Sequence, residues 1–327
     1  MVWSRFRRIL YLLLTPLLWQ PLHAAAAEGL PAAIKAADSK YLSVPDLTPK
    51  DDSVKIEAGG WEEGGAKPGP REIVKGAVKA TLTYRKVDSD GDALLVPIVT
   101  VFADGKEVAK IDEEDAAFPD PAVSVQIAQL DPANKYPDVV VSFYTGGAHC
   151  CSNTSVITGG KDGAAWSEID VGQFDGGPLT AVDLDGDGAY EFETRDNAFL
   201  YAFGCYACSE APLEVLALQD GAVKNVSREP RFRSAHEAWL KSMVGNAPDE
   251  DVNGFLAGYV AEKSLLGEGK EAWDLMLAHY DKASDWGLEN CSQPPDDEGE
   301  CPGKLEILAF PDALERMLNE NGYTIGD

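Results

Sequence analysis

The chain has 327 residues, 45% of them hydrophobic, with 28 lysines and arginines against 55 aspartates and glutamates. Its formal net charge of −27 argues against nucleic acid and anionic membrane surfaces as partners, since both are bound by basic faces. The hydrophobic fraction is ordinary for a globular protein, and the length favours two domains. We expect most of the acidic side chains to lie on a solvated surface.

Residues 1–27 predict a secretory signal peptide. Three arginines open the segment, Ile9–Leu18 is an apolar run, and Ala24–Ala27 supplies small residues for cleavage. The apolar run is too short for a transmembrane helix. We therefore expect export to the periplasm or the extracellular space, and no membrane span in the mature chain.

Residues 28–70 are rich in alanine, proline, glycine and charge, and we interpret them as a lead-in or linker. From Arg71 the pattern becomes that of β-strands, and Asp104-Gly105 between two strand-like runs predicts a hairpin. The strand-like segments are Val78–Tyr84, Leu94–Phe102, Glu107–Ile111, Val123–Leu130, Asp138–Tyr144, Ser155–Thr158, Trp166–Val171, Leu179–Val182, Tyr190–Glu193 and Leu213–Leu218. Residues 71–231 therefore predict a mostly antiparallel β domain, either propeller-like or a sandwich.

The apolar period becomes helical after residue 231. Arg233–Val244, Val252–Val260 and Ala272–Tyr280 carry apolar residues at helical spacing. Pro311–Glu320 begins with proline and is followed by an Asn-Gly stop. Residues 232–327 therefore predict an α-helical module, and strands followed by helices place the whole chain in the α+β class.

The most informative motif is an acidic loop between two strand-like segments. Its carboxylates are Asp183, Asp185, Asp187 and Glu191, and two glycines between them allow a tight turn. Clustered carboxylates repel one another unless a cation neutralises them, and oxygen ligands suit Ca²⁺. The motif does not fit an EF-hand, because Thr194 stands at its twelfth position and no helices flank it. The alternative is an acidic β-turn that holds no ion.

A weak repeat connects this loop to an earlier segment. Residues 125–141 and residues 179–193 both run through a strand, an acidic turn, a further acidic residue and a second strand. Their offset of about fifty residues is of the order of one propeller blade. The earlier unit keeps Asp131, Asn134 and Asp138 but lacks the Gly-Asp-Gly core, so we expect it to be structural.

At these residues, over about 123–194, the sequence resembles the FG-GAP repeat family (integrin-α-like and VCBS-related). The resemblance implies Ca²⁺-binding loops at β-propeller hairpins, with Asp183, Asp185, Asp187 and Glu191 as ligands and a backbone carbonyl near Ala189 as another. The family's Phe-Gly start is imperfect here, because an aspartate follows Phe174. A third, weaker cluster of candidate calcium ligands comprises Asp88, Asp90 and Asp92.

The remaining candidates for chemistry are cysteines and histidines. The six cysteines are Cys150, Cys151, Cys205, Cys208, Cys291 and Cys301. In an exported protein an even number of cysteines predicts disulfides. We expect the Cys150-Cys151 pair to bond to the Cys205/Cys208 pair, and Cys291 to form a local bridge with Cys301.

Two other interpretations of the cysteines stay open. One is a zinc or copper site formed by His149 and four cysteines. The other is a redox pair at Cys205 and Cys208, although the thioredoxin-like βαβ context is not visible. His149 itself is expected to be a hydrogen-bonded structural residue, and His236 and His279 to be partly exposed on helices.

These observations favour an exported, calcium-stabilised protein that binds an unidentified protein or glycan partner or supports the cell envelope, and that is not an enzyme. One alternative is a metal-assisted hydrolase in which a pocket gathers His149 with Asp131, Asp138 or Asp183. Another is an inhibitor of an extracellular enzyme that acts through the helical module or a loop. The sequence identifies neither a substrate nor a partner.

Overall fold

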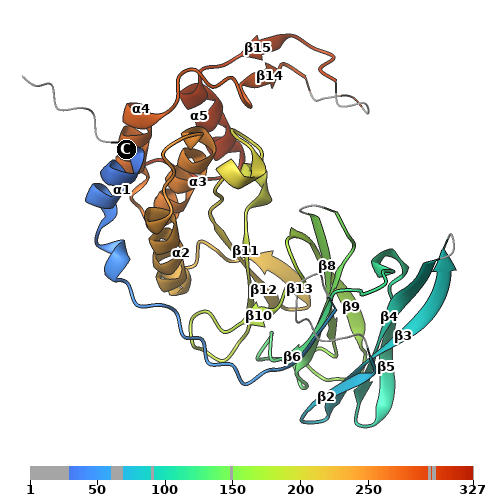
Figure 1. The fold of residues 1–327 in the computed structure, drawn as a ribbon. Helices are drawn as coiled ribbons and strands as arrows, with labels where there is room; N and C mark the ends of the chain where they lie inside the picture. Colours follow the sequence, from blue (N-terminus) through green and yellow to red (C-terminus); the bar gives the residue numbers. More distant parts are fainter. Residues whose placement is uncertain are drawn as a thin grey trace, which may run out of the picture.

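The computed structural model describes residues 29–59, 69–89, 92–147, 150–293, 296 and 300–326 (Figure 1). Within these residues, one helix precedes three stacked β-sheets, and four further helices and a small hairpin follow them (Figure 1). The predicted signal peptide, Asp90 and His149 lie outside the described residues. The α+β class predicted from the sequence is confirmed, with antiparallel sheets preceding the helices.

Each of the three sheets is antiparallel. The first sheet consists, in order, of β2 (Arg71–Lys75), β3 (Val78–Ser89), β4 (Asp92–Ala103) and β5 (Lys106–Asp112). The central sheet has the order β1 (Val54–Ala58), β6 (Val123–Ala128), β7 (Asp138–Tyr144), β8 (Cys150–Thr158) and β9 (Ser167–Asp175). The third has the order β10 (Ala181–Val182), β11 (Glu191–Arg195), β12 (Leu213–Gln219) and β13 (Ala222–Asn225).

The strand periodicity explains why the sheets stack. Every residue of β6 and β7 is buried, so the central sheet is covered on both faces. Val125 and Ile127 pack against the first sheet, whereas Ala128 packs against the third. Successive side chains of a strand point to opposite faces, so one strand contributes to two separate cores. Between the central and third sheets, the buried amide of Gln126 pairs with both the N–H and the carbonyl of Ala181, each at 2.8 Å.

The helices pack mainly on one another, and α2 also packs on the third sheet. They are α1 (Leu30–Asp38), α2 (Arg233–Gly245), α3 (Val252–Leu265), α4 (Gly269–His279) and α5 (Phe310–Glu320), and the small hairpin is β14 (Glu289–Cys291) with β15 (Leu305–Ile307). The short 3₁₀ turns are η1 (Tyr41–Ser43), η2 (Glu114–Ala116), η3 (Asn197–Phe199), η4 (Tyr206–Cys208) and η5 (Pro230–Phe232). The side chains of Val215, Ala217 and Ala235 form part of the core between β12 and α2.

Residues 28–70, predicted as a lead-in, contribute to both parts of the fold. They contain α1, which packs on the helices, and β1, which pairs with β6 at the edge of the central sheet. Buried charges hold α1 in place, because Lys263 Nζ lies 2.6 Å from Asp38 Oδ1 and also pairs with Glu268. Although burial favours the neutral acid, hydrogen bonds from Lys263 and Lys40 lower the pKa of Glu268 to about 2.

A second buried pair joins α2 to α3. His236 is only 2% exposed, so the prediction that it is partly exposed is wrong. Its Nδ1 lies 2.8 Å from Glu262 Oε1, and its Nε2 donates to the carbonyl of Ser227 at 2.7 Å. Burial favours the neutral imidazole, but the Glu262 carboxylate outweighs it and raises the pKa of His236.

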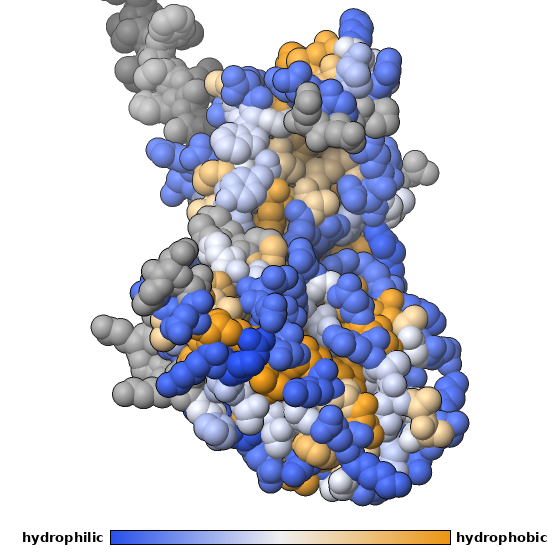
Figure 2. Space-filling view, turned by 90° about the vertical axis from the view of Figure 1, so that its right-hand side faces the viewer, coloured by the Kyte–Doolittle hydropathy of each residue, from blue (hydrophilic) through white to orange (hydrophobic). Residues whose placement is uncertain are grey.

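The surface is largely polar on the face drawn in Figure 2, with apolar residues visible between hydrophilic ones. Among the exposed large apolar side chains are Trp286 (47%) and Ile307 (66%). Within the described residues, no helix combines the length and apolar character needed to cross a membrane.

Candidate metal centre

The acidic motif Asp183–Glu191 forms the connection between β10 and β11. Gly186 and Gly188 have φ angles of 80° and 91°, a left-handed backbone that glycine adopts without strain. Asp183 is buried and accepts hydrogen bonds from the N–H groups of Gly186 at 2.8 Å and Gly188 at 3.2 Å. The first aspartate of the motif therefore holds the loop closed around its own carboxylate.

The next two aspartates are held in the same way. Asp185 Oδ1 accepts from the N–H of Asp187 at 3.1 Å, and Asp187 Oδ1 accepts from the N–H of Ala189 at 2.8 Å. One carboxylate oxygen from each of Asp183, Asp185 and Asp187 lies within 4.8 Å of the others, and the described residues contain no other such group of three acidic, histidine or cysteine side chains. Oxygens at this separation can contact one Ca²⁺ at its usual ligand distances of about 2.3–2.6 Å.

Glu191, the first residue of β11, places a fourth carboxylate beneath the loop. It is 1% exposed, and its Oε2 accepts from the N–H of Leu184 at 3.2 Å. Burial raises the pKa of Glu191 to about 7, and the charges of Asp185 and Asp187 act in the same direction. A positive charge close to the loop would therefore favour the ionised form of this side chain.

Arg231, on η5, supplies such a charge. Its Nη1 lies 3.0 Å from Asp185 Oδ2, 3.3 Å from Asp187 Oδ2 and 3.5 Å from Glu191 Oε1. The guanidinium thus neutralises part of the loop from its open side. Sequence reasoning missed Arg231, because it is 46 residues from Asp185 and belongs to no recognisable motif.

The structure brings the two acidic turns together. A pocket of about 290 Å³ is lined by residues that include Asp131, Asp187, Glu191 and Arg231. The backbone N–H of Tyr190 also donates to the carbonyl of Gln129 at 2.9 Å, which ties one acidic turn to the other. The candidate site therefore lies where the central sheet meets the third sheet.

The earlier unit is organised around Asp138. Its Oδ2 accepts from the N–H groups of Leu130 at 3.1 Å and Asp131 at 3.3 Å, and its Oδ1 accepts from the Asn134 amide at 2.9 Å. Asp138 is fully buried, and burial raises its pKa. Within the described residues, each of these hydrogen bonds to the Asp138 carboxylate comes from a neutral donor.

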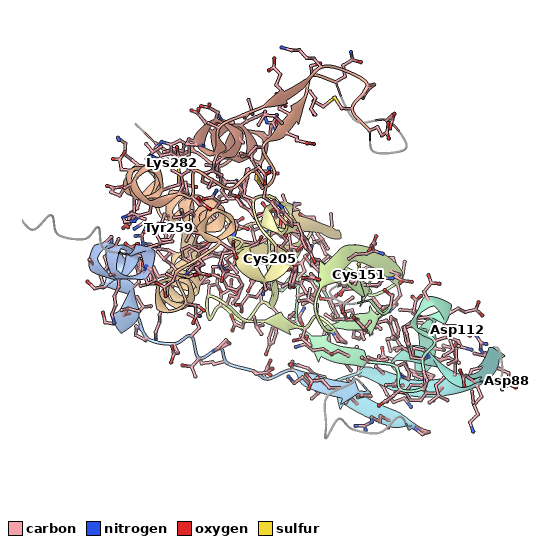
Figure 3. The ribbon with its side chains drawn as sticks, turned by 45° about the horizontal axis from the view of Figure 1, so that its top comes forward. Asp88, Asp112, Cys151, Cys205, Tyr259 and Lys282 are labelled. Carbon is pink, nitrogen blue, oxygen red and sulfur yellow. A yellow bond between two sulfur atoms is a disulfide. The ribbon has the colours of Figure 1, made fainter. Side chains whose placement is uncertain are left out.

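The weaker acidic cluster lies elsewhere. Asp88 and Asp92 are exposed near the tip of the hairpin between β3 and β4, and Figure 3 shows Asp88 far from the helices. Asp90 lies outside the described residues. Ion binding by this cluster stays a prediction.

The cysteines pair differently from the expected cross-links. Cys205 bonds to Cys208, so the predicted bridges from these two residues to the Cys150-Cys151 pair are wrong. The local bridge between Cys291 and Cys301 is present. Cys151 is also disulfide-bonded, while the side chain of Cys150 lies outside the described structure. Because Cys205 and Cys208 belong to one turn of four residues, this bridge requires no long-range contact.

Comparisons with known proteins match the helical module by itself and also a longer part of the chain. A family model for the sll0997 C-terminal domain matches residues 233–322, which contain α2 to α5. The probable thylakoid lumen protein sll0997 of Synechocystis sp. is 44% identical over 257 residues, covering 77% of this chain and 75% of the relative. The chain belongs to the sll0997 family. Its similarity to this member extends beyond the helical module into the β-sheets.

A second relative shares a smaller part of its length. The uncharacterized protein y4bJ of Sinorhizobium fredii is 36% identical over 204 residues, which is 61% of this chain but 32% of that protein. No solved structure matches the chain.

Proposed function

We propose that this protein is an exported, non-enzymatic binding or structural protein in which one Ca²⁺ stabilises the junction between the sheets and the helical module. The observation that carries the proposal is the grouping of Asp183, Asp185 and Asp187 oxygens within 4.8 Å, above the buried Glu191. The resemblance to FG-GAP loops supports the same ligand set. Export is supported by the predicted signal peptide and by the printed name of the Synechocystis relative, which places that protein in the thylakoid lumen.

Arg231 gives calcium binding a structural consequence. Its Nη1 contacts three carboxylates that would face the ion, so Ca²⁺ and the guanidinium compete for the same oxygens. Arg231 lies on η5, directly before α2. Calcium would therefore replace a weak, partly exposed ion-pair network with direct metal–oxygen bonds at the point where the sheets meet the helices.

The affinity expected is that of an extracellular calcium module, with a Kd on the order of 10⁻⁴–10⁻³ M. At a calcium concentration about 100-fold above Kd, binding to the folded state alone adds about 2.7 kcal/mol of stability. Such an ion contributes to shape and stability, and the partner, a protein or a glycan, would be bound by another surface.

Thermal unfolding in calcium and in chelator tests the proposal. We expect calcium to raise the Tm of the wild type and to have no effect on Asp185→Asn, which removes a ligand charge. Asp170→Asn is the matched control, because Asp170 is exposed on β9, away from the loop. A wild-type Tm that is the same in calcium and in chelator would contradict the proposal.

A further inference from the structure

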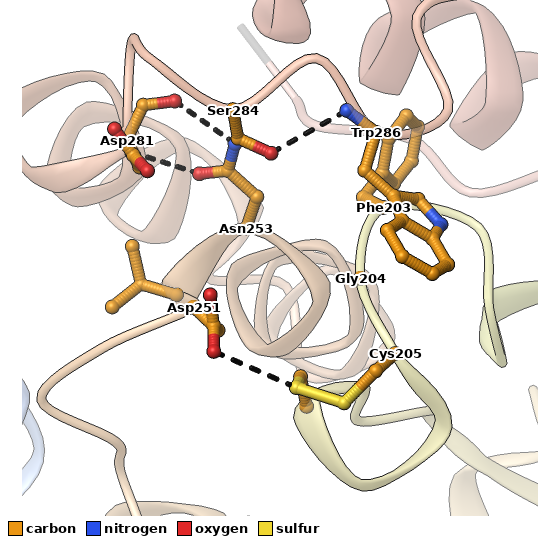
Figure 4. A pocket seen from close by; sticks show the side chains of 10 residues that line it. Phe203, Gly204, Cys205, Asp251, Asn253, Asp281, Ser284 and Trp286 are labelled. Carbon is orange, nitrogen blue, oxygen red and sulfur yellow. Dashed lines mark hydrogen bonds between the residues drawn. A yellow bond between two sulfur atoms is a disulfide. The ribbon is translucent and has the colours of Figure 1, made fainter.

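The Cys205–Cys208 disulfide lines a surface pocket of about 220 Å³ beside α3. Figure 4 shows the bridge on one side of this pocket, Trp286 and Phe203 on another, and Asp251, Asn253 and Asp281 across from them. Neither cysteine is buried, and the pocket is open to solvent. A thiol from outside can therefore reach the sulfur atoms of this bridge.

The bridge is poorly suited to a purely stabilising role. Only three positions separate Cys205 from Cys208, compared with ten for Cys291 and Cys301. In the chain-entropy account, a disulfide stabilises a fold by restricting the unfolded chain, and the shortest loops restrict it least. An accessible bridge that closes a very short loop fits chemical exchange better than it fits cross-linking.

Acidic side chains line the pocket beside the bridge. Asp251 Oδ2 lies 3.9 Å from Cys208 Sγ, and Asp251 has a left-handed backbone with φ of 51° at the start of α3. An adjoining pocket of about 450 Å³ shares Asp251 and Asp281 with the first and adds Asp249 and Glu250. Among the described residues that line the two pockets, none is lysine or arginine. An incoming thiolate is therefore repelled unless its carrier is positively charged.

We propose that Cys205–Cys208 is a redox-active disulfide that exchanges with a dithiol presented on a positively charged surface. A thiolate of the partner attacks one sulfur, the Cys205–Cys208 bond breaks, and a mixed disulfide forms while the released sulfur takes up a proton. The second thiol of the partner then attacks the partner's own sulfur in the mixed disulfide. This step releases the second cysteine as a thiol and leaves the partner with a disulfide. Two electrons and two protons pass from the partner to Cys205 and Cys208, and no other reactant is needed.

The location of the bridge gives this exchange a structural consequence. The turn η4 packs so closely on α3 that a Cβ at Gly254 would lie 2.6 Å from the Cys208 carbonyl oxygen. On its other side, Tyr206 donates a hydrogen bond to Asp175 at the end of β9. Reduction frees a turn that contacts both the helical module and the central sheet.

The rates of reduction by two small thiols of opposite charge test the proposal. The oxidised protein is treated with cationic cysteamine or anionic 2-mercaptoethanesulfonate, and each cysteine is followed by alkylation and peptide mass spectrometry. We expect Cys205 and Cys208 to be reduced before Cys291 and Cys301, and cysteamine to be faster by about tenfold or more at low ionic strength. Oxidised dithiothreitol should then re-form the Cys205–Cys208 bridge.

Variants identify the source of the charge preference. In the double variant Asp251→Asn/Asp281→Asn, the preference for cysteamine should fall at Cys205–Cys208 and stay unchanged at Cys291–Cys301. Asp312→Asn, on α5 and away from the pocket, should leave both unchanged. The proposal is overturned if Cys205–Cys208 is reduced no faster than Cys291–Cys301, or if the double variant keeps the full charge preference.

Discussion

In each of the two acidic turns of this protein, a buried carboxylate accepts a hydrogen bond from the backbone. The other groups around that carboxylate differ between the two turns. Asp138 accepts the N–H of Leu130 at 3.1 Å, and Glu191 accepts the N–H of Leu184 at 3.2 Å. Around Asp138 the other contacts come from neutral N–H donors, including Asn134, whereas Glu191 faces two further carboxylates and Arg231. The two turns thus differ in local charge: the contacts of Asp138 are neutral, whereas Glu191 shares its surroundings with other carboxylates and with one cationic side chain.

The first prediction concerns the turn around Asp138, in which the carboxylate accepts hydrogen bonds from neutral donors of the same turn. Asp138→Ala leaves the N–H groups of Leu130 and Asp131 and the amide of Asn134 without their acceptor in a buried site. We expect a loss of roughly 3–5 kcal/mol in the free energy of unfolding, measured by urea denaturation. The loss should be the same in calcium and in chelator. A loss that appears only in calcium would show that this turn also binds the ion.

Acid unfolding tests the charged side chains that hold α1 in place, among them Glu268. The pKa of Glu268 is about 2 in the folded protein, below its ordinary value of 4.5, so its ionised form stabilises the fold. This contribution is present above about pH 4.5 and is lost as the pH falls towards 2, and we expect it to be roughly 2–3 kcal/mol. Glu268→Gln should be less stable than wild type at pH 6 and equal to it near pH 2, by chemical denaturation. An undiminished difference at pH 2 would contradict the assignment.

Asp183→Ala tests the loop that we propose needs an ion. In chelator, the N–H groups of Gly186 and Gly188 lose their acceptor, and we expect a loss of about 1–2 kcal/mol. At a calcium concentration about 100-fold above Kd the loss should be greater, by about 2–3 kcal/mol, because the variant also loses the energy of ion binding. Equal losses in calcium and in chelator would mean that the loop of Asp183, like the turn around Asp138, gains no stability from Ca²⁺.

The smallest expected effect on stability belongs to Arg231, which is about one third exposed. Arg231→Met should lower stability in chelator by about 1 kcal/mol, because an exposed ion pair contributes little. The same change removes the cation that competes for Asp185, Asp187 and Glu191, so calorimetry should show tighter calcium binding. Weaker binding in the variant would show that Arg231 helps to hold the ion.

Much of the fold was predictable because strand and helix periods are local properties. The alternation in residues 123–128 and the helical spacing in residues 252–260 each identify an element. The covering of both faces of the central sheet was not predicted, since it depends on which sheets become neighbours. The edge strand Val54–Ala58 was missed because it lies in a segment rich in breaker residues and pairs with β6, about seventy residues later.

The candidate site was predictable only in part, for a similar reason. The spacing of Asp183, Asp185 and Asp187 identified the loop, whereas Arg231 reaches it through tertiary structure. His236 was predicted to be partly exposed, because a helical position alone does not reveal that the residue is buried and pairs with Glu262 on the next helix. The pairing of Cys205 with Cys208 was open to prediction, since a turn of four residues brings two cysteines together, but long-range bridges were favoured instead.

Native mass spectrometry of the purified protein tests the central claim most directly. We predict one Ca²⁺ per chain in millimolar calcium, its loss in chelator and in Asp185→Asn, and its retention when Asp88 and Asp92 are both changed to asparagine. A wild-type chain without bound calcium under these conditions would contradict the claim. An ion that persists in Asp185→Asn but is lost from the Asp88/Asp92 variant would do so equally.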